Sequence, residues 1–179
     1  MPLHPRRAKL ADYYTPTVIQ QTIAEADMTP LERLLLSHIF ESERDGESWY
    51  FFAESQPADM IIVARAALKA ALAASQLDVD NTANSIVTKL LASLKDEDQD
   101  GHLDLDLSET SWEFIAQDIV RRSSTLRYVS AVSSFTCSRM RPDGFGGAVV
   151  VISADAILGK STNDLLEEFI EQVAPGSDS

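Results

Sequence analysis

The chain has little cysteine and no long apolar run, and both shortages restrict what it can be. Cys137 is the only cysteine among 179 residues. A single thiol forms no internal disulfide and no zinc site of the CxxC type. The longest apolar stretch, from Met60 to Ala74, is interrupted by Arg65 and Lys69. A stretch with two internal charges does not predict a transmembrane helix.

Basic residues are also scarce, with 15 Lys and Arg against 28 Asp and Glu, so the net charge is -13. Such a charge argues against general binding to nucleic acid or to a membrane surface, because both are anionic. It is compatible with a basic partner protein, with metal ions, or with imitation of nucleic acid. The first residues contain three basic side chains but no apolar run after them. We therefore predict no secretory signal peptide and a soluble, cytoplasmic protein.

Complete catalytic motifs are missing as well. The chain contains no HExxH, GxSxG, P-loop or GxGxxG pattern. His38 stands among apolar helix residues and is expected to be structural, and Cys137 is expected to be a small core residue. The glycines of "GFGG" (144–147) are typical of a hairpin turn. We therefore favour a binding or regulatory protein, and keep as an alternative an enzyme whose site combines residues distant in sequence.

The apolar content of 45% is enough for one buried core at this length. We predict a loose arm over 1–17, a single domain over 18–174 and a disordered tail over 175–179. The patterns predict helices over the ranges 17–26, 29–46, 57–75, 82–95, 108–124 and 161–173. Segment 48–54 is either a strand or the start of a helix, and 126–140 with 148–153 predicts a hairpin. The expected fold is α+β: mainly helical, with a small antiparallel sheet near the C-terminus and a last helix.

The acidic stretch "DEDQDGHLDLDL" (96–107) follows much of the pattern of an EF-hand calcium loop. Such loops need oxygen ligands at positions 1, 3, 5, 7, 9 and 12, with Gly at position 6. Gly101 occupies position 6 here, and Leu107 stands at position 12 instead of the closing Glu. Asp106 lies one residue before that position, and Glu109 lies two after it. The candidate ligands are Asp96, Asp98, Asp100, the carbonyl of His102, Asp104 and Glu109.

Two interpretations of this loop stay open. It is either a calcium site, with Ca²⁺ as the one candidate cofactor, or an acidic turn between helices, where Asp and Gly are common. The incomplete closing position predicts weak calcium affinity in the first case.

Arginines gather directly after the acidic region. No acid occurs between residues 119 and 142, while five arginines do: Arg121, Arg122, Arg127, Arg139 and Arg141. Arginine captures carboxylate or phosphate with two parallel hydrogen bonds. These side chains either pair with carboxylates of the same chain or form one basic face for an anionic partner.

Three functions follow from these patterns. The leading hypothesis is an acidic binding or regulatory protein that engages a protein partner through the acidic loop and the Arg-rich face. The first alternative is a calcium-binding module that uses residues 96–109. The second is an inhibitor from a mobile element that imitates the phosphate spacing of nucleic acid with its acidic surface.

The stretches "ERLLLSHIFESERDGESWYFF" and "MRPDGFGGAVVVI" carry a further likeness. Through them the chain resembles the uncharacterised small acidic proteins of proteobacterial plasmids and integrated elements. This resemblance implies no particular activity.

Overall fold

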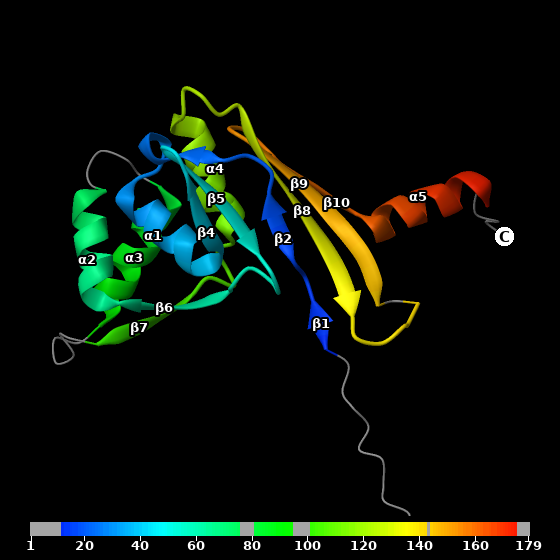
Figure 1. Cartoon of the computed structure of the whole chain (residues 1–179), viewed down its shortest axis with the longest axis horizontal. Coiled ribbons are helices and arrows are strands. Elements are labelled where there is room, and N and C mark those ends of the chain that lie inside the picture. The colour runs from blue at the N-terminus through cyan, green and yellow to red at the C-terminus, as the bar shows by residue number, and fades with distance from the viewer. Residues whose placement is uncertain (1–11, 76–80, 95–100, 143, 175–179) are drawn as a thin grey trace, which may run out of the picture.

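The computed structural model describes residues 12–75, 81–94, 101–142 and 144–174, and an antiparallel sheet of eight strands dominates them (Figure 1). Its strands are β1 (Tyr13–Tyr14), β2 (Thr17–Ile19), β3 (Ile23–Ala24), β4 (Glu41–Asp45), β5 (Ser48–Ala53), β8 (Tyr128–Cys137), β9 (Phe145–Ser153) and β10 (Ile157–Ser161). They follow the order β10-β9-β8-β2-β5-β3, with β1 paired to β8 and β4 paired to β5. A separate antiparallel pair is formed by β6 (Met60–Ala64) and β7 (His102–Asp106).

Helices cover part of one face of this sheet. The described residues form α1 (Pro30–Ile39), α2 (Arg65–Ala74), α3 (Thr82–Ser93), α4 (Trp112–Arg122) and α5 (Thr162–Val173), with a short 3-10 turn at Glu25–Asp27. Helix α1 lies against β4 and β5, and α4 lies against β8 and β9. Helices α2 and α3 pack beyond α1, whereas α5 projects away from the other helices (Figure 1). The core between α1, α4 and the sheet contains Leu31, Leu35, Leu36, Phe51, Ile115, Ile119, Val129 and Ile152.

The prediction of a mainly helical domain with a small C-terminal sheet is wrong. The fold is α+β, but the large sheet includes strands from both ends of the chain. The predicted hairpin exists as β8 and β9, and β8 also pairs with β2 and β1. Residues 17–26, predicted as a helix, form β2, β3 and the 3-10 turn. Their partners lie far along the chain, so no local pattern reveals the pairing.

The helix predicted over 29–46 ends at Ile39, because the residues after it form a hairpin. Its start is as expected: Thr29 caps the helix, Pro30 is the first helical residue, and Glu32 completes a capping box. Strands β4 and β5 then meet at a turn in which Gly46 has a φ of 61°. Glycine adopts this left-handed backbone without strain, so Gly46 ends a strand rather than a helix.

The segment 57–75, predicted as one helix, is a strand followed by a helix. In β6 the side chains of Ile61 and Val63 are buried, while Met60 and Ile62 point to solvent. This alternation is that of a half-buried strand. The helices predicted at 82–95, 108–124 and 161–173 are present as α3, α4 and α5, with shorter bounds.

The predicted arm and tail fall largely outside the described part of the chain. Residues 1–11 and 175–179 are not among the described residues. The remainder of the predicted arm joins the sheet, since Tyr13 pairs with Cys137 and Thr17 pairs with Ser133.

Candidate functional site: an apolar wing and an inner groove

The end of the acidic stretch is a strand. Asp96, Asp98 and Asp100 lie outside the described residues. His102 and Asp104 lie on the exposed face of β7, and Glu109 is exposed in the turn before α4. Asp106 accepts a hydrogen bond from the backbone of Ser108 at 2.9 Å, and the hydrogen bonds from Ser108 lower the pKa of the Asp106 carboxyl.

Leu107, at the closing position of the calcium pattern, belongs to the core. Its side chain is 3% exposed, and its backbone N–H donates to the Asp59 carbonyl at 2.7 Å. Leu103 and Leu105 are buried beside it. The described ranges contain no group of three His, Cys, Asp or Glu side chains that could hold a metal ion. Since three of the candidate ligands lie outside those ranges, calcium binding stays a prediction.

The five arginines do not gather in one place. Arg121 and Arg122 lie in the last turn of α4, and Arg127 directly precedes β8. Arg139 and Arg141 follow the other end of β8, a ten-residue strand that spans about 30 Å. The Arg-rich face is therefore divided between the two ends of β8.

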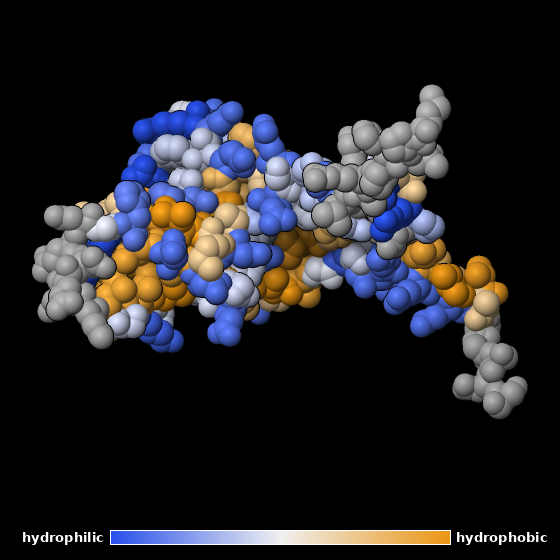
Figure 2. Space-filling model, turned by 90° about the horizontal axis from the view of Figure 1, so that it is seen from below, coloured by the Kyte–Doolittle hydropathy of each residue, from blue (hydrophilic) through white to orange (hydrophobic). Residues whose placement is uncertain are grey.

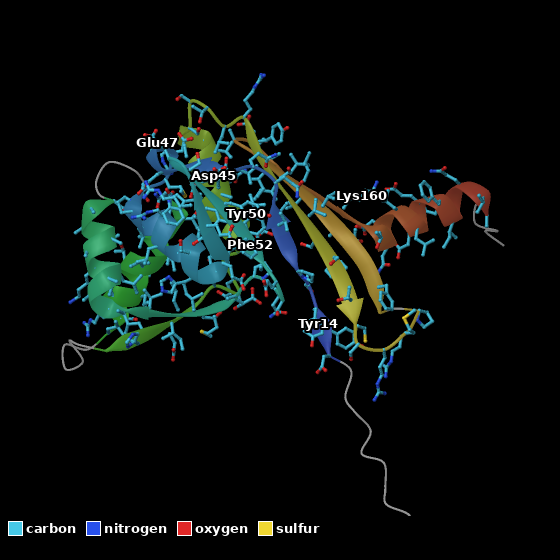
Figure 3. The ribbon with its side chains drawn as sticks, viewed as in Figure 1. Tyr14, Asp45, Glu47, Tyr50, Phe52 and Lys160 are labelled. Atoms are coloured by element: carbon cyan, nitrogen blue, oxygen red, sulfur yellow. The ribbon has the colours of Figure 1, made fainter. Side chains whose placement is uncertain are left out.

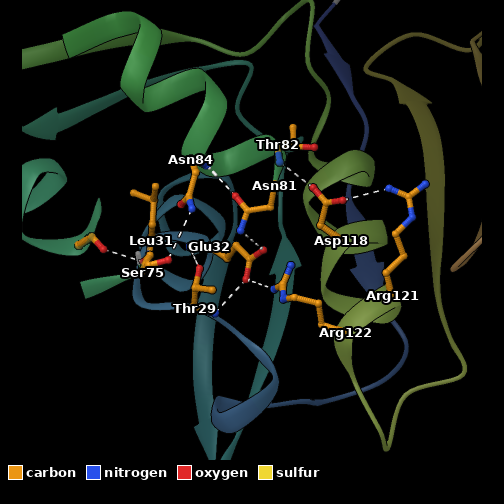
Figure 4. A network of polar contacts seen from close by, with 11 residues as sticks. Thr29, Leu31, Glu32, Ser75, Asn81, Thr82, Asn84, Asp118, Arg121 and Arg122 are labelled. Carbon is orange, nitrogen blue, oxygen red and sulfur yellow. Dashed lines mark hydrogen bonds and ion pairs between the residues drawn. The ribbon is translucent and has the colours of Figure 1, made fainter. Parts of the chain in front are cut away.

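Two of these arginines serve a polar network inside the molecule (Figure 4). Arg122 forms an ion pair with Glu32, whose side chain is fully buried. Glu32 also accepts hydrogen bonds from the backbone of Thr29 at 2.8 Å and from the side chain of Asn81 at 3.2 Å. These bonds tie the starts of α1 and α3 to the end of α4.

Asp118 makes a second connection between α3 and α4. It accepts the backbone N–H of Thr82 at 2.7 Å and pairs with Arg121 at 3.1 Å. The contacts of Arg121 and Arg122 thus match the interpretation that they neutralise carboxylates of the same chain.

The two histidines and the cysteine of the described residues lie on three separate elements. The Nδ1 atom of His38 in α1 is 2.9 Å from the Leu34 carbonyl, within the same helix. His102 begins β7, and Cys137 is buried at the end of β8. Among the described residues these three side chains do not form one site, so no reaction can be derived from them.

The sheet face opposite α1 and α4 carries a row of side chains that crosses five strands. The strand register places Phe52, Val18, Val132, Val149 and Lys160 side by side in that order. Figure 3 labels Phe52 and Lys160 at the two ends of this row. Val132 is 44% exposed and Val149 is 50% exposed. An apolar, uncovered sheet face of this kind is typical of an interaction surface.

Helix α5 continues this surface with an apolar stripe of its own. The helix starts at a capping box in which Ser161 and Asp164 bond each other, and the hydrogen bonds from Ser161 lower the pKa of Asp164. None of its residues is buried. Leucine, phenylalanine, isoleucine and valine recur with helical spacing on one side of the helix at Leu165, Leu166, Phe169, Ile170 and Val173.

We call the uncovered sheet residues and this stripe together the apolar wing. It comprises Val132, Val149, Val151, Leu158, Leu165, Leu166, Phe169, Ile170 and Val173, each between 39% and 82% exposed. A crease of about 310 Å³, lined by Val132, Val149 and Leu165 among others, joins its two parts. Figure 2 shows α5 as an apolar projection at one end of the molecule.

A second concavity, the inner groove, lies between the start of α4 and β8, β9 and β10. It has a volume of about 390 Å³, and its lining includes Pro57, Trp112, Glu113, Ser133, Val150 and Ser161. Figure 2 shows a hollow between the main body and the projecting end of the molecule. Burial raises the pKa of the Glu113 carboxyl, and the nearby Asp59 charge raises it further, while a hydrogen bond from the Glu113 backbone acts in the opposite direction.

The sequence-based candidates include neither the wing nor Glu113. The stripe in "STNDLLEEFIEQV" is visible as helical periodicity, but periodicity predicts an apolar face without indicating whether another element covers it. By sequence, Thr110 and Glu113 have the spacing of a capping box. In the structure the helix cap is Ser111, whose side chain makes no capping bond.

Among the described residues, no helix has the length and apolar character needed to cross a bilayer. Comparison of the chain with family models, curated proteins and solved structures finds no match. The resemblance to proteins of plasmids and integrated elements therefore stays a prediction, and the function has to be argued from the surface itself.

Proposed function

We propose that the protein is a non-enzymatic binding protein that holds a partner protein on its apolar wing. The observation that carries this proposal is α5, a helix with five exposed apolar residues and no buried one. An isolated helix of twelve residues is only marginally stable in water. A partner that covers the stripe would stabilise the helix and remove its apolar surface from solvent.

Charge favours a basic partner over a second copy of the chain. The side of α5 away from the stripe carries Asp164, Glu167, Glu168 and Glu171. Two copies would each bring a net charge of -13 to the contact. The partner that fits best is an apolar segment flanked by Lys or Arg, because it matches both the stripe and the acids beside it.

The acidic loop and the Arg-rich face remain predicted partner surfaces, but the geometry supports them less. Arg121 and Arg122 already pair with Asp118 and Glu32. Imitation of nucleic acid also stays a prediction. The exposed acids of β4, β7 and α5 lie in three separate parts of the molecule rather than along one row (Figure 1).

A labelled amphipathic peptide of Leu and Lys provides a direct test, with binding followed by fluorescence anisotropy. We expect the double substitution Leu166→Asp, Phe169→Asp to weaken binding at least about tenfold, because two central apolar contacts are lost. Gln172→Asp adds a charge beside the stripe without removing an apolar contact, and should leave affinity nearly unchanged. A peptide of Ser and Lys controls for attraction by charge alone.

Two outcomes would contradict this proposal. Equal affinity of the wild type and the double variant would show that the peptide does not use the stripe. Sedimentation equilibrium tests whether a second copy of this chain covers the wing instead. If the wild type is a dimer and the double variant is a monomer, the occupant of the wing is a second copy and not a basic partner.

A further inference from the structure

The inner groove is lined by a carboxyl group, that of Glu113, one oxygen of which is buried without a hydrogen-bond partner among the described residues. Glu113 lies in the first turn of α4, and the buried oxygen is its Oε2 atom. A carboxylate that is partly buried and incompletely hydrogen-bonded is unfavourable, and a cation bound beside it in the groove would stabilise its charged form.

The charges around Glu113 favour a positively charged donor. Asp59 is close enough to disfavour the charge on Glu113, so two carboxylates lie near each other at this side of the groove. Lys160 also lines the groove, but its Nζ forms an ion pair with Glu168 of α5. The Lys160 ammonium group is therefore already engaged by another carboxylate.

The remaining walls suit an alkyl chain. Trp112, Pro57 and Val150 supply apolar surface. Thr17 and Ser133 supply hydroxyl groups, which already bond each other at 2.8 Å. The groove volume of about 390 Å³ lies in the range typical of small-ligand sites.

We propose that the inner groove binds a cation on an alkyl stem, with Glu113 as its counter-ion. The ligand class is a primary amine or a guanidinium, either free as in a polyamine or carried by a Lys or Arg side chain of another protein. The site shares the lining residues Val149 and Lys160 with the crease of the wing, but it does not depend on the function proposed for that surface.

Isothermal calorimetry with n-pentylammonium chloride tests this site, and pentan-1-ol serves as the uncharged ligand with the same chain. We expect the amine to bind more tightly than the alcohol in the wild type. Glu113→Gln should weaken amine binding about tenfold and leave alcohol binding unchanged, because only the charged contact is lost. Glu109→Gln removes an equal charge from an exposed turn and should change neither affinity.

The two sources of the cation are separated by a third ligand, the peptide acetyl-Leu-Lys-Leu-amide. Tighter binding of the peptide than of pentylammonium, lost in Glu113→Gln, assigns the groove to a side chain of a partner. Weaker binding of the peptide assigns it to a free amine.

Equal amine affinity in the wild type and in Glu113→Gln would overturn the proposal, as would equal affinity for amine and alcohol in the wild type. The double substitution on α5 separates this result from the proposed function. It should leave amine binding intact even where it abolishes binding of the Leu and Lys peptide.

Discussion

Leu107 shows how one side chain changes the interpretation of a whole loop. By sequence position it replaces the closing Glu of a calcium loop, whereas in the structure it is a core residue with 3% exposure. The alternation in "HLDLDL" places every second residue in the core and every Asp in solvent. A spacing of two residues is therefore typical both of side chains on one face of a strand and of the ligands in a calcium loop.

Leu107→Glu would complete the calcium pattern by sequence, yet we expect it to destabilise the fold. The substitution places a carboxylate in the core and removes a packed apolar side chain, which together cost roughly 2–5 kcal/mol. Urea unfolding with calcium and with a chelator measures the change. Stability that calcium restores to the wild-type level would contradict the assignment of Leu107 to the core.

Glu113 gives a second prediction, which concerns how the stability of the fold changes with pH. Its pKa is raised above the usual 4.5 in the folded protein. Between 4.5 and the raised pKa, the folded state therefore binds more protons than the unfolded state, and stability falls as pH rises. Glu113→Gln removes this loss. We expect the variant to be more stable than the wild type at neutral pH and equally stable well below 4.5.

Urea unfolding of the wild type and of Glu113→Gln, at neutral pH and well below pH 4.5, measures this difference. A wild type that is the more stable protein at neutral pH would contradict the prediction, and would indicate that the ionised Glu113 is already satisfied in the free protein.

Arg122 and Arg121 offer a matched pair of substitutions in the polar network. Arg122→Ala leaves Glu32 buried without its counter-ion, so we expect a loss of about 3 kcal/mol or more in the free energy of unfolding. Arg121→Ala breaks an ion pair whose Arg side chain is 51% exposed, and should cost less than about 1 kcal/mol. Urea unfolding measures both losses. If the two substitutions lower the free energy of unfolding equally, the burial of Glu32 does not make the Arg122 ion pair the more important one.

At the scale of elements, α5 contacts mainly β9 and β10 at the edge of the sheet, through a hydrogen bond from Gly147 to Thr162 and the ion pair between Lys160 and Glu168 among others. Since none of its residues is buried, removal of residues 162–179 should change the melting temperature of the remainder by only a few degrees. Circular dichroism measures both the melting temperature and the helix content. A large loss of stability would show that α5 supports the sheet and is not reserved for a partner.

Local patterns predicted some of these elements and missed others for identifiable reasons. The capping box at Thr29 marks the start of α1. The glycines of "GFGG" (144–147), expected to form the hairpin turn, lie mostly within β9, which begins at Phe145. Strand β6 was hidden because it runs directly into the Ala-rich helix α2. Strand β2 was missed because three residues carry no reliable pattern, and its partners β5 and β8 are remote in sequence.

The candidate site was less accessible from sequence than the fold. The apolar stripe of α5 was readable, but its exposure depends on what the other elements leave uncovered. One of the two interpretations of the five arginines, a single basic face, is based on their nearness in sequence, but the length of β8 separates them in space. Proximity along an extended strand does not imply proximity in space.

At the scale of the molecule, the net charge of -13 predicts how binding to the wing responds to salt. Raising the ionic strength from about 0.05 M to 0.5 M should weaken binding of the Leu and Lys peptide several-fold, because charge attraction is screened. The apolar contact should persist and still depend on Phe169. Anisotropy titrations at both salt concentrations test this, and complete loss of binding at high salt would contradict an apolar contact.

The place of β2 in the sheet has a consequence for synthesis of the chain. Strand β2 lies between β5 and β8, and its Thr17 bonds Ser133, which is 116 residues later. During translation β2 therefore has to wait for its partner until β8 has left the ribosome. Contacts at such separation also slow folding in general. The nascent chain should thus acquire protease resistance only after β8 has emerged.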